Sequence, residues 1–254
     1  MEHETARKVL KPYPIGWKAK IGILLPAHDT GYGSYEFQVL CPDGVAILET
    51  RVSGRALTLE ELKNMRTDAV HGAKLLAQAG PNVICYIGTA ACFVLGVDGE
   101  KALMKEMQDA TGIPAVAGGA CVSDALRSLG VKKMSLYVPT NEQITKISVQ
   151  YFQDQGFNVK DFDALGEESI ANINRMSPWE LYSNIVKLYR RTPDIDGIFV
   201  TGGCFRILEA LETLEKDIGK PVVMTTAANM WRCLQIAGVK EPIHGFGQLL
   251  ERSR

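Results

Sequence analysis

The stretch DGIFVTGGC, from Asp196 to Cys204, joins a short apolar run to a glycine turn. Ile198–Val200 predicts a buried parallel strand, Thr201–Gly203 predicts a turn, and an amphipathic helix is expected from about Phe205. Glycines between a strand and a helix let backbone N–H groups approach a ligand at the positive end of the helix dipole. Such turns are also ordinary packing features of α/β folds, so this stretch alone does not establish a ligand site.

The rest of the chain continues the same alternation of strands and helices. Apolar or β-branched runs predict strands at 21–26, 45–52, 83–87, 115–117, 134–138, 159–164, 198–200 and 222–225. Helices are expected at 58–80, 100–111, around 123–126, at 141–155, from Ser177 to Arg191 and from about Asn229 to Gly238. The polar, turn-rich segment 27–36 predicts a loop. Sustained alternation predicts an α/β fold with mostly parallel strands and helices on both faces.

Two parts of the chain share a spacing of glycines. Gly112–Gly130 and Gly219–Gly238 each begin with Gly-x-Pro, and their terminal glycines lie 18 (130−112) and 19 (238−219) residues apart. Each copy is preceded by an apolar strand and a glycine turn, at Gly88 and at Gly202. The pattern predicts a duplicated β-turn-α-β-α unit, although chance similarity between two generic α/β units is the alternative. Duplication would place the two turns across a cleft between two similar lobes, approximately 1–118 plus 224–254 and 119–223.

Composition excludes several classes of partner. The chain has 254 residues, a formal net charge of −1, 46% hydrophobic and 22% charged residues, which is typical of a globular protein. Near-zero charge without a Lys/Arg run argues against nucleic acid or an anionic membrane as the main partner. No apolar stretch approaches the roughly 18 residues of a membrane span, and charges stand where a signal peptide needs an apolar core. We therefore expect a cytoplasmic protein.

The six cysteines do not form a metal-binding pattern. There is no C-x-x-C pair, and the four histidines do not cluster near the cysteines. A zinc site is therefore not expected, nor is a disulfide framework in a cytosolic chain of this size. Most of the cysteines are expected to be small buried hydrophobic residues, namely Cys41, Cys85, Cys121 and Cys233.

The two turns could supply converging hydrogen-bond donors. Thr89–Ala91 would contribute N–H groups on one side and Gly203 and Cys204 on the other, with hydroxyls from Thr89 and Thr201. Neutral donors of this kind suit a carboxylate, or a carboxylate whose negative charge grows in an enolate-type intermediate. Neither turn contains Lys or Arg, and neither has the full dinucleotide-binding spacing. The sequence therefore favours a small carboxylate ligand, and phosphate is the alternative.

Candidates for proton transfer lie near these turns. The thiol of Cys204 would be stabilised as a thiolate by a helix amino terminus, and the alternative is a thiol packed in the core. His28 and Asp29 follow the first strand at its carboxyl end, where α/β sheets bind ligands, and could act as a general acid–base pair. Their alternative is a plain polar loop. Cys92, in the first turn of a helix, is a weaker candidate.

The strand followed by Gly-Thr-Ala-Ala in one half, and DGIFVTGG in the other, resemble the aspartate/glutamate racemase superfamily. The nearest branch is similar to the arylmalonate decarboxylases and maleate cis-trans isomerases. The similarity runs from IGILLP, residues 21–26, to Trp231 and Gly238. The resemblance implies two similar lobes that clasp a small carboxylic acid without a metal or organic cofactor. It also makes a homo-oligomer possible.

The two cysteines that racemases and isomerases place at the turns fall here at Gly88 and Gly202. Glycine at the first position is the decarboxylase-like choice, whereas glycine at the second departs from the family, and Cys204 lies two positions later. The resemblance further implies substrate contacts from the following residues: Pro26, Gly88, Thr89, Ala90, Ala91, Thr140, Asn141, Thr201, Gly202, Gly203 and Arg206. Thr140 stands near the family's tyrosine, and Arg206 matches an arginine of the isomerase pattern.

The expected activity is decarboxylation of a small mono- or dicarboxylic acid through an enediolate, with Cys204 or the pair His28 and Asp29 handling the proton. Racemisation needs an acid or base on each face, and both standard positions are glycine. The alternatives are a maleate isomerase or racemase-type isomerase, a carboxylate-binding relative without catalysis, and a lyase of unrelated chemistry.

Overall fold

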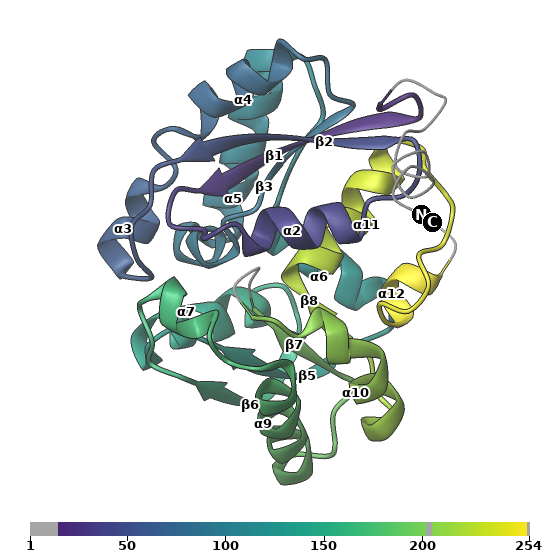
Figure 1. The fold of residues 1–254 in the computed structure, drawn as a ribbon. Coiled ribbons are helices and arrows are strands. Elements are labelled where there is room, and N and C mark those ends of the chain that lie inside the picture. Colours follow the sequence, from purple (N-terminus) through teal and green to yellow (C-terminus); the bar gives the residue numbers. More distant parts are fainter. Residues whose placement is uncertain (1–14, 202–204, 253–254) are drawn as a thin grey trace.

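The computed structural model, which describes residues 15–201 and 205–252, places parallel strands in two four-stranded sheets (Figure 1). The first sheet has the order β2-β1-β3-β4, and the second has the order β6-β5-β7-β8. The strands are β1 (Ala19–Pro26), β2 (Val45–Val52), β3 (Val83–Tyr86), β4 (Ala115–Ala117), β5 (Lys133–Val138), β6 (Asn158–Ala164), β7 (Gly197–Val200) and β8 (Val222–Met224). The inner strands β3 and β7 are buried along their whole length, as their continuous apolar sequences predict.

The two sheets repeat one topology. If β5–β8 are numbered from one, their order becomes the same as that of β1–β4. The predicted α/β class with two similar parallel-sheet lobes is therefore confirmed, and the duplicated glycine spacing belongs to corresponding parts of the two sheets. The exact division of the chain into lobes at residues 118 and 223 stays a prediction.

Helices connect the strands and cover the sheets. They are α2 (Tyr32–Val39), α3 (Leu59–Asn64), α4 (Ala69–Ala77), α5 (Thr89–Thr111), α6 (Gly118–Ser128), α7 (Glu142–Gln153), α8 (Ile170–Ile173), α9 (Pro178–Arg191), the 3₁₀ helix η1 (Leu208–Ala210), α10 (Leu211–Ile218), α11 (Thr225–Ile236) and α12 (Gln248–Glu251). The side chains of Thr58 and Ser177 accept N–H bonds from the third residue after each, as their capping sequences predict.

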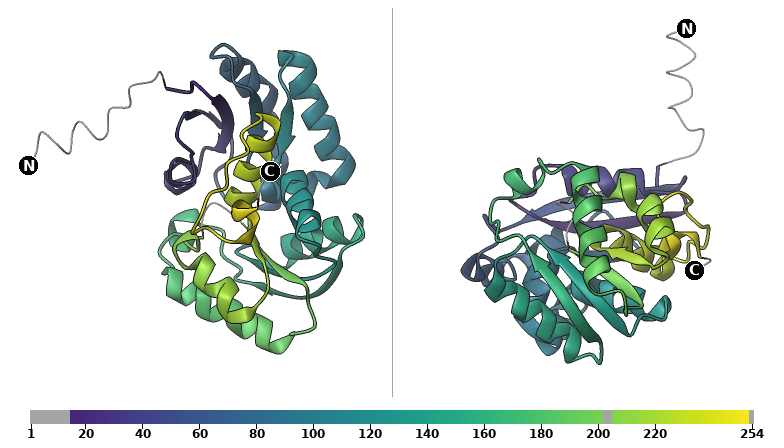
Figure 2. Two further views of the ribbon diagram at one scale, coloured as in Figure 1. Left: turned by 90° about the vertical axis from the view of Figure 1, so that its right-hand side faces the viewer. Right: turned by 90° about the horizontal axis from the view of Figure 1, so that it is seen from below.

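Two helices, α6 and α11, lie between the sheets. They pack against each other, and each contacts strands of both sheets, α6 at β4 and β8 and α11 at β3 and β8. Figure 2 shows α11 returning from the second sheet to the first. Because both helices begin directly after a strand of their own sheet, their amino-terminal turns lie near the edge where the strands end.

Five predictions about helices are wrong. The expected helix 58–80 is two helices, α3 and α4, because turns that include the bonds Thr67 N–H to Asn64 O and Ala69 N–H to Arg66 O separate them. The expected loop 27–36 contains the start of α2. The helix expected at Phe205 begins at Leu208, since Phe205 and Ile207 are buried outside any helix. Finally, α5 and α11 begin immediately after their strands, earlier than predicted.

Within the part of the chain that the structure describes, no helix has both the length and the apolar composition needed to cross a bilayer.

Candidate active site

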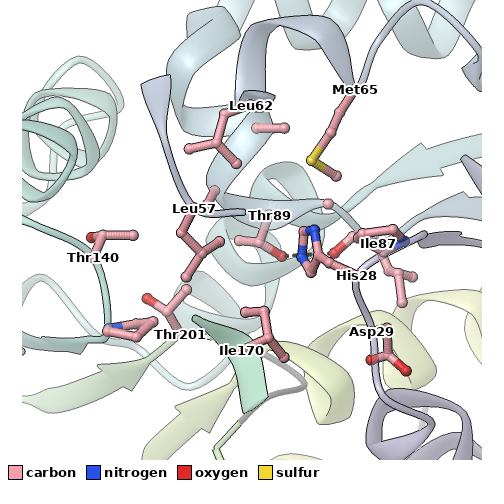
Figure 3. Close-up of a pocket in the computed structure, with 15 residues that line it drawn as sticks. His28, Asp29, Leu57, Leu62, Met65, Ile87, Thr89, Thr140, Ile170 and Thr201 are labelled. Carbon is pink, nitrogen blue, oxygen red and sulfur yellow. Dashed lines mark hydrogen bonds between the residues drawn. The ribbon is translucent and has the colours of Figure 1, made fainter. Parts of the chain in front are cut away.

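A pocket opens where strands of both sheets end (Figure 3). Its volume is about 80 Å³, which suits a small ligand. Residues that follow β1, β3, β5 and β7 line it together with apolar residues from α3, α8 and the segment before α3. The lining residues are Pro26, His28, Asp29, Leu57, Leu62, Met65, Ile87, Gly88, Thr89, Ala90, Ala91, Pro139, Thr140, Ile170 and Thr201. None of these described residues is Lys or Arg.

The first glycine turn is an inverse γ-turn centred on Gly88. Gly88 has φ −72° and ψ 66°, and the N–H of Thr89 donates to the carbonyl of Ile87 at 2.8 Å. This internal bond already uses the Thr89 N–H, and the predicted ligand contact from Thr89 stays a prediction. The Thr89 hydroxyl lies 3.4 Å from the same carbonyl, a weak contact that leaves it able to turn toward a ligand.

The next two N–H groups have no such partner. Ala90 and Ala91 occupy the first turn of α5, and their N–H groups bond to nothing among the described residues, whereas Cys92 N–H donates to Gly88 O at 3.0 Å. Free N–H groups at a helix amino terminus, combined with the helix dipole, attract an anion. Both alanines line the pocket, so this turn can hold a carboxylate against neutral donors.

The second sheet contributes hydroxyl groups to the same pocket. The Thr201 hydroxyl, just past β7, is buried and has no hydrogen-bond partner in the described ranges. Thr140 also lines the pocket, but its hydroxyl lies 3.0 Å from that of Thr145. Asn141, by contrast, caps α7 by accepting the N–H of Ile144 at 3.0 Å and is absent from the lining. Thr201 is therefore the available polar group on this side.

Gly118 sets the position of the first turn. A Cβ at Gly118 would lie 2.4 Å from Thr89 Oγ1 and 3.2 Å from Thr89 Cα. We expect Gly118→Ala to displace Thr89, lowering stability by about 1–3 kcal/mol and weakening the binding of a small carboxylate. Gly99→Ala, inside α5 with its nearest contact at 3.2 Å, is the matched control and should not weaken binding. Urea unfolding and calorimetric titration measure both, and equal affinities in the two variants would contradict the expectation.

His28 and Asp29 both line the pocket but do not form a pair. Asp29 accepts N–H bonds from Gly31 at 2.7 Å and Gly33 at 3.1 Å, so its carboxylate caps the start of α2. Burial lowers the pKa of His28, and its Nδ1 is buried without a partner among the described residues. His28 is therefore neutral near pH 7 and able to exchange a proton, while Asp29 is held by backbone groups.

An apolar wall faces these polar groups, and its residues were not predicted from the sequence. Leu57, Leu62, Met65 and Ile170 form it, and Figure 3 shows Leu62 and Met65 above Thr89. A hydrogen bond from Leu57 N–H to Glu168 O, at 3.3 Å, joins the segment before α3 to the segment that follows β6 of the second sheet. The capping box at Thr58 predicts a helix on which residues 62 and 65 lie about one turn apart, on the same face. This spacing of two apolar residues was the sequence signal for the wall.

Arg206 lies outside this pocket. Its guanidinium pairs with Glu209 at 3.4 Å, lies over the ring of Tyr32, and borders a separate, more open hollow. Gly202, Gly203 and Cys204 fall outside the described residues. The first described helix after β7 begins at Leu208. The described residues therefore contain no helix that begins directly after Cys204, and the predicted stabilisation of its thiolate by a helix dipole has no support from them.

The other cysteines are placed largely as expected. Cys85, Cys121 and Cys233 are buried, and the thiols of Cys121 and Cys233 contact that of Cys85. Burial raises the pKa of Cys92, which makes this thiol a poor nucleophile. Cys41 is half-buried and donates to the carbonyl of Val45. In the described ranges, no group of three or more His, Cys, Asp or Glu side chains could hold a metal ion.

Comparisons with known proteins point to one family. The family model described as arylmalonate decarboxylase matches residues 22–250. The arylmalonate decarboxylase of Bordetella bronchiseptica is 26% identical over 185 residues, 72% of this chain and 77% of that protein. A maleate isomerase of Pseudomonas putida is 24% identical over 222 residues, 84% of this chain and 87% of that protein.

Solved structures agree with the fold. The maleate isomerase Iso of Pseudomonas putida S16, an alanine variant solved with maleate, superposes with a TM-score of 0.87 at 23% identity, covering 92% of this chain and 97% of that one. A crystal structure of arylmalonate decarboxylase superposes with a TM-score of 0.78 at 23% identity, covering 92% of this chain and 100% of that one. With the family model spanning both sheets and the pocket between them, the chain belongs to the arylmalonate decarboxylase family.

Proposed function

We propose that the protein decarboxylates a small malonate-type dicarboxylic acid without a cofactor. The observation that carries the proposal is the contrast across the pocket. The unpartnered N–H groups of Ala90 and Ala91 lie on one side, and the apolar side chains of Leu57, Leu62 and Met65 lie on the other. One carboxylate of the substrate is held by the N–H groups, while the second lies against the apolar wall, where loss of its charge is favoured.

The reaction balances without an added reactant. The bond between the α-carbon and the second carboxylate breaks, and its electron pair passes into the held carboxylate to give an enediolate and neutral CO₂. The N–H groups of the first turn stabilise the growing charge on the enediolate oxygens. A proton is then transferred to the α-carbon from an acid, either the thiol of Cys204 or the imidazolium form of His28, which is the minor form near pH 7 because burial lowers the pKa of His28, and the product is a monocarboxylate.

Two other functions are kept as outcomes of the test. Maleate isomerisation is favoured by the relatives of that name, which match most of the chain. Binding without catalysis is favoured by the glycines at Gly88 and Gly202, where the family's racemases and isomerases carry cysteines.

A substrate panel separates the three functions. The purified protein is incubated with aryl- and alkylmalonates, maleate and hydantoins, and the products are followed by NMR. We expect monocarboxylates and CO₂ from malonates only. Fumarate from maleate would replace the proposal with isomerisation, and saturable binding of malonates without any product would replace it with a binding function.

The apolar wall is expected to control the rate. Leu57 is buried at the pocket, and Leu57→Asn would place an amide where the leaving carboxylate loses its charge. Because a polar neighbour stabilises the charged ground state of the bound substrate, we expect kcat to fall by about 10-fold or more and substrate affinity to rise. Leu57→Met, which keeps the wall apolar, is the control. Equal kcat values for the two variants would contradict a role for the wall.

A further inference from the structure

The hydroxyl of Tyr86 is a buried donor without a partner. Tyr86 is the last residue of β3 and has no exposed surface, and its Oη bonds to no other group among the described residues. Buried polar groups of this kind usually have a hydrogen-bond partner, and an exception calls for an explanation such as a ligand.

The position of this hydroxyl relates it to the first turn. A Cβ at Gly88 would lie 3.0 Å from both Cζ and Oη of Tyr86 and 2.9 Å from Cε of Met65. The Tyr86 hydroxyl therefore occupies the space that a side chain at residue 88 would enter. Gly88 and Met65 both line the pocket, so the hydroxyl lies directly behind its lining.

The flexible end of Met65 lies beside the same space, since its Cε is 2.9 Å from the position that a Cβ at Gly88 would take. Met65 is unbranched with rotatable bonds, and Figure 3 shows its side chain above Thr89 and Ile87. A rotation about the Cγ–Sδ bond of Met65 would carry its Cε away from the space beside Gly88. Burial raises the pKa of Tyr86, so the group stays protonated and can donate.

We propose that the Tyr86 hydroxyl donates a hydrogen bond to the substrate carboxylate held at the first turn, after Met65 moves aside. This assignment rests on the proposed function of the pocket. It gives the first lobe a third neutral donor beside the N–H groups of Ala90 and Ala91. It also places a protonated hydrogen-bond donor in the space that a side chain at residue 88 would otherwise occupy.

The test is Tyr86→Phe, with Tyr137→Phe as the matched control. Tyr137 is a buried strand tyrosine whose hydroxyl accepts from Asn184 at 3.0 Å and does not line the pocket. The variants are compared in Tm, in Kd for phenylacetate, a monocarboxylate that cannot lose CO₂ in this way, and in kcat/KM on phenylmalonate. For Tyr86→Phe we expect an unchanged or higher Tm, a Kd raised about 10-fold or more and a similar loss of kcat/KM. For Tyr137→Phe we expect a lower Tm and an unchanged Kd.

The outcomes separate this assignment from the proposed reaction. A Tyr86→Phe protein that binds phenylacetate as the wild type does would overturn the role of Tyr86, whatever the wild type catalyses. Weakened binding in Tyr86→Phe, together with a wild type that releases no CO₂, would support the donor and reject the decarboxylation. A wild type that binds no phenylacetate would count against both.

Discussion

Replacing Cys204 with alanine is expected to lower kcat on malonates by about 10²- to 10⁴-fold, the usual contribution of a positioned acid. Cys204 is the thiol nearest in sequence to Gly202, the position where the family's second cysteine falls. Binding should change little, because the carboxylate is held by the first turn and not by the thiol. The measurement is kcat and Kd of Cys204→Ala beside the wild type.

The control is Cys41→Ser, which alters a half-buried thiol that does not line the pocket. Full turnover in Cys204→Ala would show that another group donates the proton. His28→Asn then identifies the alternative, since His28 lines the pocket with an unpartnered Nδ1 among the described residues and a pKa lowered by burial. Loss of turnover in His28→Asn alone would assign the acid to the imidazole.

Replacing Glu36 with glutamine is expected to stabilise the protein, and increasingly so as the pH rises. Glu36, in α2, is fully buried, and its Oε2 lies 2.6 Å from the hydroxyl of Thr226 in α11. Burial raises the pKa of Glu36 from 4.5 to about 8, with Asp29 and Glu209 adding in the same direction, while bonds from Thr226 and Tyr32 act against it.

The direction of the pH effect follows from this shift. Below pH 4.5 the carboxyl group is protonated in both folded and unfolded chains and costs nothing. Between pH 4.5 and 8 the unfolded chain releases the proton while the folded chain keeps it, so stability falls as the pH rises. Above pH 8 the cost is complete, on the order of a few kcal/mol, at about 1.4 kcal/mol for each unit between the two pKa values.

Urea unfolding at pH 5 and pH 8.5 measures this effect. The gain in unfolding free energy of Glu36→Gln over the wild type should be small at the lower pH and a few kcal/mol at the higher one. Glu168→Gln changes an exposed carboxylate and should give no such pH-dependent gain. A constant difference between Glu36→Gln and the wild type across this range would show that the buried carboxyl is not the group that titrates.

The fold was largely predictable from the sequence because its main signals are local. Every predicted strand lies within two residues of an observed one, since continuous apolar runs and the glycines that end them do not depend on distant parts of the chain. The helix α2 was missed because its stability comes from tertiary contacts. Glu36 and Phe37 are buried against the rest of the molecule, whereas its local cap, Asp29, stands in a segment rich in turn residues.

The site was predictable in its position but less so in its detail. Parallel strands end at one edge of a sheet, and the repeated glycine turns predicted two such edges facing each other, so the residues after β1, β3, β5 and β7 could be expected near one cleft. The use of the Thr89 N–H inside a γ-turn, and the placement of Arg206 in a separate hollow, depend on backbone geometry that no spacing encodes. The apolar wall likewise depends on where the segment before α3 crosses toward the second sheet.

The central claim is that the pocket releases CO₂ from a malonate and protonates the resulting enediolate from one face. Its most direct test is the rate of CO₂ release from methyl(phenyl)malonate, measured with the enantiomeric composition of the 2-phenylpropionate formed. We expect saturable CO₂ release and a single enantiomer of the product, since Gly88 provides no side chain to act on the first face. No CO₂ release from a malonate that binds, or a racemic product, would contradict it.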